Sequence, residues 1–528
     1  MRVFISLLMA LLLAACGQAN TTKTFRWSSQ GDYLTADPHS QNEGLNNSIN
    51  GQVFEPLVHR NKKLEIEPRL ATSWKQTSPT SWVFNLRRDA KFHSGKTLTA
   101  DDVVFSLERL QGKNSNFRVY ANALGKPTKI DDFTVQLSTD VPNPVTLEML
   151  VNLFMMEKAW CIEHKVENVQ DYVNKEETYA SRNANGTGPF KLVSRQAEVK
   201  STFTKNVAWW GIADKRFEGN VTDIAFTPIR NEATRTAALI SGELDFVIDP
   251  AIQNLAQMKA DKNLNVIEGP ENRVVFFGMD QLRDELLYSN VKGKNPLKDK
   301  RVRQAFYQAI DIDAIQKTVM RGLSVPTGVV HPNPSAAKLP ADLQKRLPFD
   351  VAAATKLMAD AGYAKGFEIT LDCPNNRYLN DEKICVAVAA MLAKINVTVR
   401  VNAMPRSTYF QKTQKLDTSF YMLGWGGSTT EPIFTLQPVL HSRNNKGDGD
   451  YNWGQVQDAK FDAMIDTLKG ETDLDKRLAM VVEAYRHHNE NIYHLPLHLQ
   501  IIPWAARANV SVVHRADNWV EVPWITIK

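Results

Sequence analysis

The alternation of strand-like and helix-like segments in two stretches constrains the fold of this chain more than any other feature. Residues 221–229 are strand-like, residues 231–242 have the pattern of a helix that begins after Asn231 and ends near Gly242, and another strand-like run follows. Residues 366–405 repeat the order strand, helix, strand. Such units are typical of α/β sheets, so we expect an α/β protein.

Other helices are expected where capping residues and apolar spacing agree. Thr99 and Asp102 precede an apolar stripe and have the spacing of a capping box, which predicts a helix that ends before Gly112. Further helices are expected within residues 299–322 (with a break at Asp311), 348–363, 458–470 and 476–491, and a late strand within 501–513.

The chain is long enough for several domains and has no composition typical of nucleic-acid binding. A length of 528 residues suggests about two to four domains. Apolar residues make up 43% and charged residues 23%, as in ordinary globular proteins. The 63 basic and 58 acidic residues leave a net charge of +5 and are scattered along the sequence. Without a basic patch, we exclude nucleic acid as a partner.

The N-terminus has the pattern of an export signal. Arg2 precedes an apolar run, residues 3–13, which is shorter than the about 20 residues needed to span a bilayer. The sequence Leu-Ala-Ala-Cys that ends at Cys16 resembles a bacterial lipobox, in which the cysteine is lipidated and becomes the new N-terminus. The alternative is a plain signal that is cleaved nearby, for example after Ala19.

The lipobox predicts a signal peptide over residues 1–15 and a lipidated tether over residues 16–24. The mature protein is then expected in the periplasm or cell envelope, soluble apart from the lipid that anchors it at Cys16. After Cys16 the cysteines are Cys161, Cys373 and Cys385, with no CxxC pair and no zinc-type spacing. Cys373 and Cys385 form either a disulfide or two buried thiols.

Six segments in fixed order resemble a known family. They are GQVFEPLVHR (51–60), LEIEPRLATSW (64–74), WVFNLRRDAKFHSGKTLTADDVVFSLERL (82–110), GTGPFKLV (186–193), RVRQAFYQAID (301–311) and LGWGG (423–427). Together they are similar to the bacterial extracellular solute-binding proteins of family 5, the dipeptide, oligopeptide and nickel receptors of ATP-driven importers. The resemblance extends from about residue 25 to about residue 499.

The resemblance implies a two-lobed periplasmic-binding-protein clamp of type II (large cluster C), with three domains because an extra domain is inserted. Lobe I is expected to comprise residues 25–59, 186–275 and 491–528, the inserted domain II residues 60–185, and lobe II (domain III) residues 276–490. Two or three strands would form the hinge on which the lobes close. The implied function is a monomeric receptor without a cofactor that delivers a small-molecule or peptide ligand to the permease and ATPase of an ABC importer.

The resemblance also indicates the ligand-binding residues. Trp425 follows a glycine and offers a flat face to a ligand, or else packs in the core. Peptide receptors of the family carry an aspartate a few residues later, which pairs with the ligand ammonium, whereas this chain has Ser428. A hydroxyl cannot neutralise a buried ammonium. Either Glu431 replaces the aspartate, or, as we favour, the ligand has no ammonium there.

A second loop offers a group for an acidic ligand. Arg377 matches an arginine that binds the ligand carboxylate in dipeptide receptors; the alternative is an ion pair with Asp381 or Glu382. Tyr378 either stacks on or hydrogen-bonds to the ligand, or else packs at the hinge. Tyr33, in a loop that resembles the first cleft-lining turn of the family, is a further expected contact. An uncharged or acidic ligand thus fits better than a zwitterionic dipeptide.

Metal binding and catalysis are not expected. His487, His488, His494 and His498 lie within twelve positions, but Pro496 interrupts any helix that would bring the last two together. No GxSxG, HExxH or phosphate-loop motif is present. The alternatives to a transport receptor are a ligand sensor or chaperone on the same fold and, more remotely, an exported hydrolase.

Overall fold

The computed structural model describes residues 22–427 and 429–528. The predictions for the signal peptide, for Cys16 and for Ser428 therefore lie outside the described residues. Within those residues, no helix combines the length and apolar character needed to cross a membrane.

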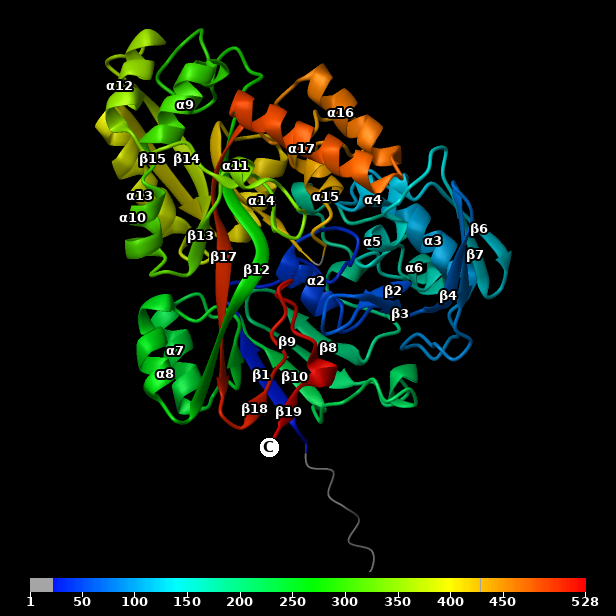
Figure 1. The fold of residues 1–528 in the computed structure, drawn as a ribbon. Helices are drawn as coiled ribbons and strands as arrows, with labels where there is room; N and C mark the ends of the chain where they lie inside the picture. The colour runs from blue at the N-terminus through cyan, green and yellow to red at the C-terminus, as the bar shows by residue number, and fades with distance from the viewer. Residues whose placement is uncertain (1–21, 428) are drawn as a thin grey trace, which may run out of the picture.

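One large mixed sheet organises the molecule (Figure 1). Its strands follow the order β15-β14-β16-β12-β17-β11-β1-β10-β9-β8, and β13 pairs with β17. The strands are β1 (Thr24–Ser28), β8 (Phe190–Gln196), β9 (Lys200–Lys205), β10 (Asp223–Phe226), β11 (Phe246–Val247), β12 (Leu264–Met279), β13 (Ser324–Pro326), β14 (Phe367–Pro374), β15 (Val397–Met404), β16 (Phe420–Gly426) and β17 (His494–Arg507). The predicted α/β class is confirmed.

Two long antiparallel strands, β12 and β17, run through the middle of Figure 1 and join two halves of the sheet. At one end lie β11, β1 and β10, and we call this part the first half; at the other lie β16, β14 and β15, the second half. The pairing of β12 with β17 is shifted between Pro270 and Val274 and again between Val275 and Phe276. A bulge bends a strand locally, so the two strands change direction near Arg273.

Helices cover both halves, and their bounds agree with the capping signals. In the first half α2 (Gly44–Asn50), α7 (Glu232–Ser241) and α8 (Leu255–Ala260) pack near the sheet. The second half carries α9 (Lys300–Ala309), α10 (Ile312–Ala314), α11 (Ala341–Gln344), α12 (Val351–Asp360), α13 (Asp381–Leu392), α14 (Arg406–Gln414), α15 (Ile433–Thr435), α16 (Ala459–Gly470) and α17 (Leu474–Asn491). Asn231 accepts from the Thr234 amide and Gly242 ends α7 with a left-handed φ of 82°, as expected.

Residues 60–185, which we call the insert, carry a separate four-stranded antiparallel sheet in the order β4-β5-β7-β6. Its elements are β4 (Ala71–Ser78), β5 (Ser81–Leu86), β6 (Lys126–Asp131), β7 (Thr134–Ser138), α3 (Ala100–Leu110), α4 (Arg118–Ala123), α5 (Thr146–Leu150) and α6 (Lys158–Glu163), and a hairpin of β2 (Val58–Arg60) and β3 (Ile66–Pro68) leads into it. The capping box predicted for Thr99 and Asp102 starts α3.

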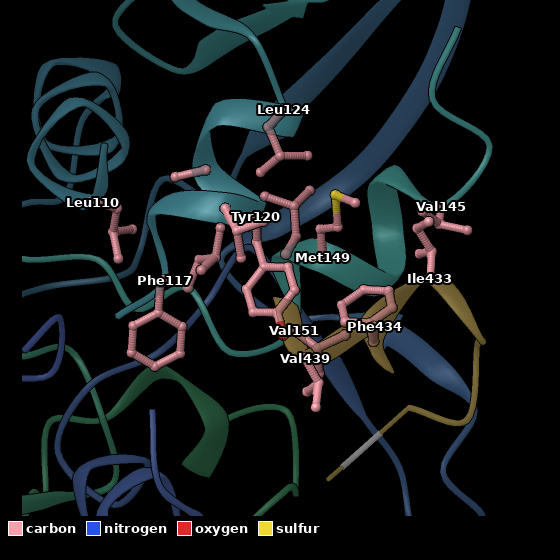
Figure 2. Close-up of a cluster of buried hydrophobic side chains, with 14 of the residues drawn as sticks. Leu110, Phe117, Tyr120, Leu124, Val145, Met149, Val151, Ile433, Phe434 and Val439 are labelled. Carbon is pink, nitrogen blue, oxygen red and sulfur yellow. The ribbon is translucent and has the colours of Figure 1, made fainter. Parts of the chain in front are cut away.

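The insert packs against the second half through an apolar cluster (Figure 2). Tyr120 of α4 stacks on Phe434 of α15 with ring centroids 5.0 Å apart, and Met149, Ile433 and Val439 lie around them. Burial of such side chains contributes roughly 1.5–3 kcal/mol each to association of the two regions. The cluster also brings the insert close to the segment that follows Trp425.

Cys373 of β14 and Cys385 of α13 form a disulfide, with Cα atoms 6.8 Å apart. The first of the two readings of these cysteines is therefore confirmed, and Cys161 is a buried free thiol. The bridge closes a loop that contains Arg377 and Tyr378.

Candidate ligand-binding site

A cavity of about 80 Å³ lies where the two halves and the insert meet. Glu43 reaches it from the first half, Tyr120 from the insert, Arg273 from β12, and Arg377 and Trp425 from the second half. A smaller cavity of about 30 Å³ shares Gly44, Arg273, Arg377 and Asp517 with it. Three regions of the chain thus contribute charged or aromatic groups to one buried space.

Trp425 packs in the core and also lines the cavity. Its indole Nε1 donates to the Phe434 carbonyl oxygen at 2.7 Å, its ring lies 4.6 Å from that of Tyr451, and 9% of the residue is exposed. Because the indole N–H already has a partner, the ring face is what remains for a ligand. Contact with a ligand stays a prediction.

The glycines around Trp425 allow close approach of other groups. A Cβ on Gly424 would lie 2.5 Å from Cε1 of Tyr378, and one on Gly426 would lie 1.7 Å from the Asn272 carbonyl oxygen. Any larger residue would displace Tyr378 or the neighbouring strand β12. These two glycines therefore hold Tyr378, Trp425 and β12 together at the cavity.

Arg377 and Tyr378 stand on a loop fixed by Asp381. The Asp381 carboxylate accepts from the backbone N–H groups of Arg377 (2.8 Å) and Tyr378 (3.0 Å). Burial raises the pKa of Asp381 to about 7, although these amides oppose the shift. The Tyr378 hydroxyl donates to the Gly424 carbonyl at 3.3 Å. Asn380, the N-cap residue of α13, makes no capping bond with its side chain and donates its side-chain amide to the Val319 carbonyl.

The ion-pair partner of Arg377 is one that the sequence did not suggest. Arg377 Nε lies 2.8 Å from Oε1 of Glu43, so the expected alternative of a pair with Asp381 or Glu382 is wrong. Asp381, the first residue of α13, instead contacts backbone amides of Arg377 and Tyr378 in the preceding loop. Both Arg377 and Tyr378 line the cavity, and Tyr378 is almost fully buried.

Glu43 is held by both of its oxygens. Oε2 accepts from the Asn46 amide at 2.9 Å as the cap of α2, and Oε1 lies 3.2 Å from Nη1 of Arg406 as well as next to Arg377. Burial favours the neutral acid, but Arg377, Arg406 and the amide outweigh it and lower the pKa of Glu43 to about 2. Glu43 is therefore ionised at neutral pH.

Arg273 is a third guanidinium at the cavity wall. Its Nε donates to Glu271 at 2.9 Å, and Glu271 accepts from Gln500 of β17 at 2.7 Å. A Cβ on Gly44 would lie 3.3 Å from Arg273 Nη2 and 3.6 Å from Arg377 Nη2. Two cationic groups thus face one small space beside Gly44. Burial and then the charges of Arg273 and Arg406 lower the pKa of Arg377, against the effect of Glu43.

Glu431, the candidate replacement for the missing aspartate, is already engaged. It pairs with Arg477 at 2.5 Å and accepts from the Ile433 amide at 2.7 Å. Its carboxylate is therefore occupied inside the protein. Thr429 and Gly427, the neighbours of Ser428, line the cavity.

Tyr33 lies in the apolar core of the first half. It is 2% exposed, its ring carries the Arg195 guanidinium at 3.7 Å, and its hydroxyl accepts from Ser201 at 3.3 Å. The described lining of the cavity does not include it. This placement gives Tyr33 a packing role, and its predicted ligand contact is not supported by the geometry.

The four late histidines do not all face one common point. His488 Nε2 and His494 Nδ1 lie 3.0 Å apart, His487 pairs with Asp458 at 2.6 Å, and His498 is buried on β17. Of the residues that the structure describes, these four do not form a group able to hold one metal ion.

Sequence reasoning missed Glu43, Arg273 and Arg406. None belongs to a motif. Glu43 and Arg273 line the larger cavity, and Arg406 the smaller one, only because distant segments meet. Only Glu43 had a local signal in the sequence: it is an acid directly before Gly44, at the start of a helix, where a negative charge is favourable.

A two-lobed α/β molecule with a charged cavity between its lobes defines a periplasmic solute-binding clamp. The family model for bacterial extracellular solute-binding proteins, family 5 (middle region), matches residues 65–447. The chain belongs to this family. Its homologues are periplasmic substrate-binding proteins of ABC importers rather than enzymes, and the chain is accordingly the extracytoplasmic substrate-binding receptor of such an importer.

Two curated relatives and one solved structure illustrate the similarity. Heme-binding protein A of Haemophilus influenzae is 27% identical, over 90% of this chain and 89% of the relative. The dipeptide-binding protein of Escherichia coli is 26% identical with the same coverage. The periplasmic binding protein DppA of Helicobacter pylori, in complex with the peptide STSA, superposes with a TM-score of 0.83 at 20% identity, over 96% of this chain and 98% of that one.

Proposed function

We propose that this receptor captures a small solute that carries an acidic group and has no free ammonium near Trp425. The solute is held between the two halves, which we take as lobes I and II with the boundaries expected from the sequence, and is passed to a permease and its ATPase. The receptor acts as a monomer and is tethered to the envelope by lipid on Cys16.

The charge of the cavity lining carries the proposal. Each carboxylate of the described lining is paired with arginine: Glu43 with Arg377 and Arg406, Glu148 with Arg60, and Asp517 with Arg515. A ligand ammonium would have to be buried without a partner or break one of these pairs, at a cost of several kcal/mol. The guanidinium of Arg377, in contrast, faces the space into which an acidic group would fit.

The rest of the lining suits an apolar body. Trp425, Tyr120, Phe434 and Tyr451 all contribute aromatic rings. Aromatic walls with a few polar groups are usual for small-molecule sites, where the rings bury the ligand and the charges orient it. Arg377 and the rings together therefore favour a compact amphipathic acid.

The test has two parts. Native mass spectrometry of the protein without residues 1–15, purified without unfolding, identifies what the receptor retains. Isothermal titration calorimetry then compares dialanine with N-acetyl-dialanine, which has the same carboxylate and no ammonium. We expect an acidic, amine-free adduct and tighter binding of the acetylated probe. A ladder of peptide masses, or preference for dialanine, would disprove the proposal.

A further inference from the structure

Around the two cavities, the arginines and the carboxylates that pair with them are unequal in number. Arg377 and Arg406 share the single carboxylate of Glu43, while Arg273 pairs with Glu271. Three guanidinium groups therefore face two carboxylates. The nearby acids are engaged elsewhere, since Asp517 pairs with Arg515 and Asp249 with Arg235. Asp381, which is not part of the described lining of either cavity, accepts from backbone amides of its own loop.

Glu43 occupies a fixed position within this group. Its capping bond to the Asn46 amide holds the carboxylate in place, and only 4% of its side chain is exposed. Arg377 and Arg406 belong to the second half, whereas Glu43 belongs to the first. The Glu43 carboxylate of the first half is therefore the counter-ion of two arginines of the second half.

The open space lies beside this counter-ion. Gly44 has no side chain, and a single carbon placed there would be within 4 Å of both Arg273 and Arg377. An acidic group that enters from the main cavity meets these guanidiniums after Glu43 has neutralised part of their charge. The net charge left on Arg377, Arg406 and Glu43 is that of one cation. A second acidic group on the same ligand would be repelled by Glu43.

We propose that Glu43 is the specificity-determining residue for ligand charge, and that it restricts the receptor to ligands with a single net negative charge. The inference rests on the proposed function, because it assumes that an acidic ligand binds beside Arg377. It goes further by assigning the ligand class, a monoanion, and the residue that enforces it.

The test compares two probes that differ in one charge. N-succinyl-dialanine carries two carboxylates, and its succinyl monomethyl ester has nearly the same size and carries one. Calorimetry gives their affinity ratio for the wild type and for Glu43→Gln, which keeps the shape and the cap acceptor but loses the charge. We expect the wild type to prefer the monoester and the ratio to shift by at least about tenfold toward the diacid in Glu43→Gln.

Two variants separate charge from structure. Glu43→Gln combined with Arg406→Gln removes one charge of each sign and should restore the monoester preference. Glu43→Asp keeps the charge and should retain that preference even if both probes bind more weakly. Glu285→Gln, an exposed acid paired with Lys292, is the control for loss of a carboxylate and should leave the ratio unchanged. Melting curves of all variants report on folding.

An affinity ratio that is the same in the wild type and in Glu43→Gln would overturn the inference, as would failure of the diacid to bind Glu43→Gln. The proposed function fails separately, when the wild type prefers dialanine to N-acetyl-dialanine. If the wild type prefers N-acetyl-dialanine but the affinity ratio of diacid to monoester does not shift in Glu43→Gln, the proposed function stands and this inference is wrong.

Discussion

Arg377 reaches the cavity from a loop that other residues hold in place. Replacing Arg377 with Ala leaves Glu43 paired with Arg406 and leaves the backbone contacts of Asp381 intact. We therefore expect the variant to fold and to bind N-acetyl-dialanine roughly 10- to 100-fold more weakly, as for loss of a charge-assisted hydrogen bond. Calorimetry measures this. Arg301→Ala, at an exposed pair with Asp299, is the control, and an unchanged affinity for Arg377→Ala would refute the anchoring role.

Gly424 is the residue on which the position of Tyr378 depends. In Gly424→Ala the new methyl group would overlap the Tyr378 ring, so we expect a loss of about 1–3 kcal/mol in the free energy of unfolding together with weaker ligand binding. Urea denaturation and calorimetry give the two values. In Gly470→Ala the methyl group would meet no atom closer than 3.8 Å, so that variant should keep both values. Equal behaviour of the two variants would contradict this account.

At the residue scale, sequence motifs located the segments of the site but not its pairs. Trp425, Arg377 and Tyr378 were found because each stands in a segment shared with a family. The partner of Arg377 could not be found in this way, because Glu43 lies more than 300 positions away and contacts it only after the two halves meet. Tyr33 was assigned by the same kind of likeness, but its side chain points into the core.

At the scale of secondary structure, local signals predicted helices better than strands. The start and end of α7 follow from Asn231 and Gly242, whose effects are confined to one turn. The long strands were only partly expected: a late strand was expected within residues 501–513, whereas β17 already begins at His494, and Pro496 read as a break. In the structure, Pro496 and Pro503 belong to β17 and both pair with β12 on one side. On the other side of β17, β13 and β11 pair with other residues. Proline is tolerated there because its missing N–H leaves no partner strand unsatisfied.

The disulfide supports the loop that carries Arg377 and Tyr378. Replacing Cys373 and Cys385 with Ala should lower the free energy of unfolding by about 3 kcal/mol, as for a short closed loop, and weaken ligand binding because the loop gains freedom. Urea denaturation with and without reductant tests this: the wild type should lose stability on reduction in denaturant, and the double variant should not. A wild type that is equally stable when reduced would contradict it.

At the scale of the whole molecule, buried histidines make stability depend on pH. Burial is the largest cause that lowers their pKa values, to about 3 for His39, His331 and His498 and about 4 for His93 and His488. The unfolded chain, with histidine pKa values near 6.5, therefore takes up protons first as the pH falls. The free energy of unfolding should decrease below about pH 6.5, by up to about 1.4 kcal/mol per pH unit for each histidine.

Thermal melting between pH 7.5 and 4 checks this dependence. Asp381 acts in the opposite direction, because its raised pKa of about 7 makes it less stabilising as the pH rises toward neutrality. Burial also raises the pKa values of Asp102, Asp249 and Glu431. Burial lowers the pKa values of His494 and His514 as well, so seven histidines oppose four carboxyl groups. His498→Gln removes one titrating group and should reduce the slope. A melting temperature that stays constant from pH 7.5 to 5 would show that these histidines do not control stability.

The proposed lipid anchor at Cys16 concerns the whole molecule. Cys16→Ser should move the protein from the membrane fraction to the soluble fraction, because a chain without its lipids has little affinity for the bilayer. Cell fractionation and the mass of the N-terminal peptide test this. Cys161→Ser, which alters a buried thiol in the insert, should remain with the membrane. Retention of Cys16→Ser at the membrane would argue for a different mode of attachment.

The position of β17 in the chain bears on secretion. This strand joins the halves of the sheet and pairs with β11, β12 and β13, yet it follows all three in the sequence and is synthesised after them. Until β17 is in place, the edges of β11 and β12 that it covers stay open, and the two halves of the sheet are not joined. A product that ends before residue 494 would present those edges to envelope proteases, so that truncated receptors are removed before they can occupy a permease.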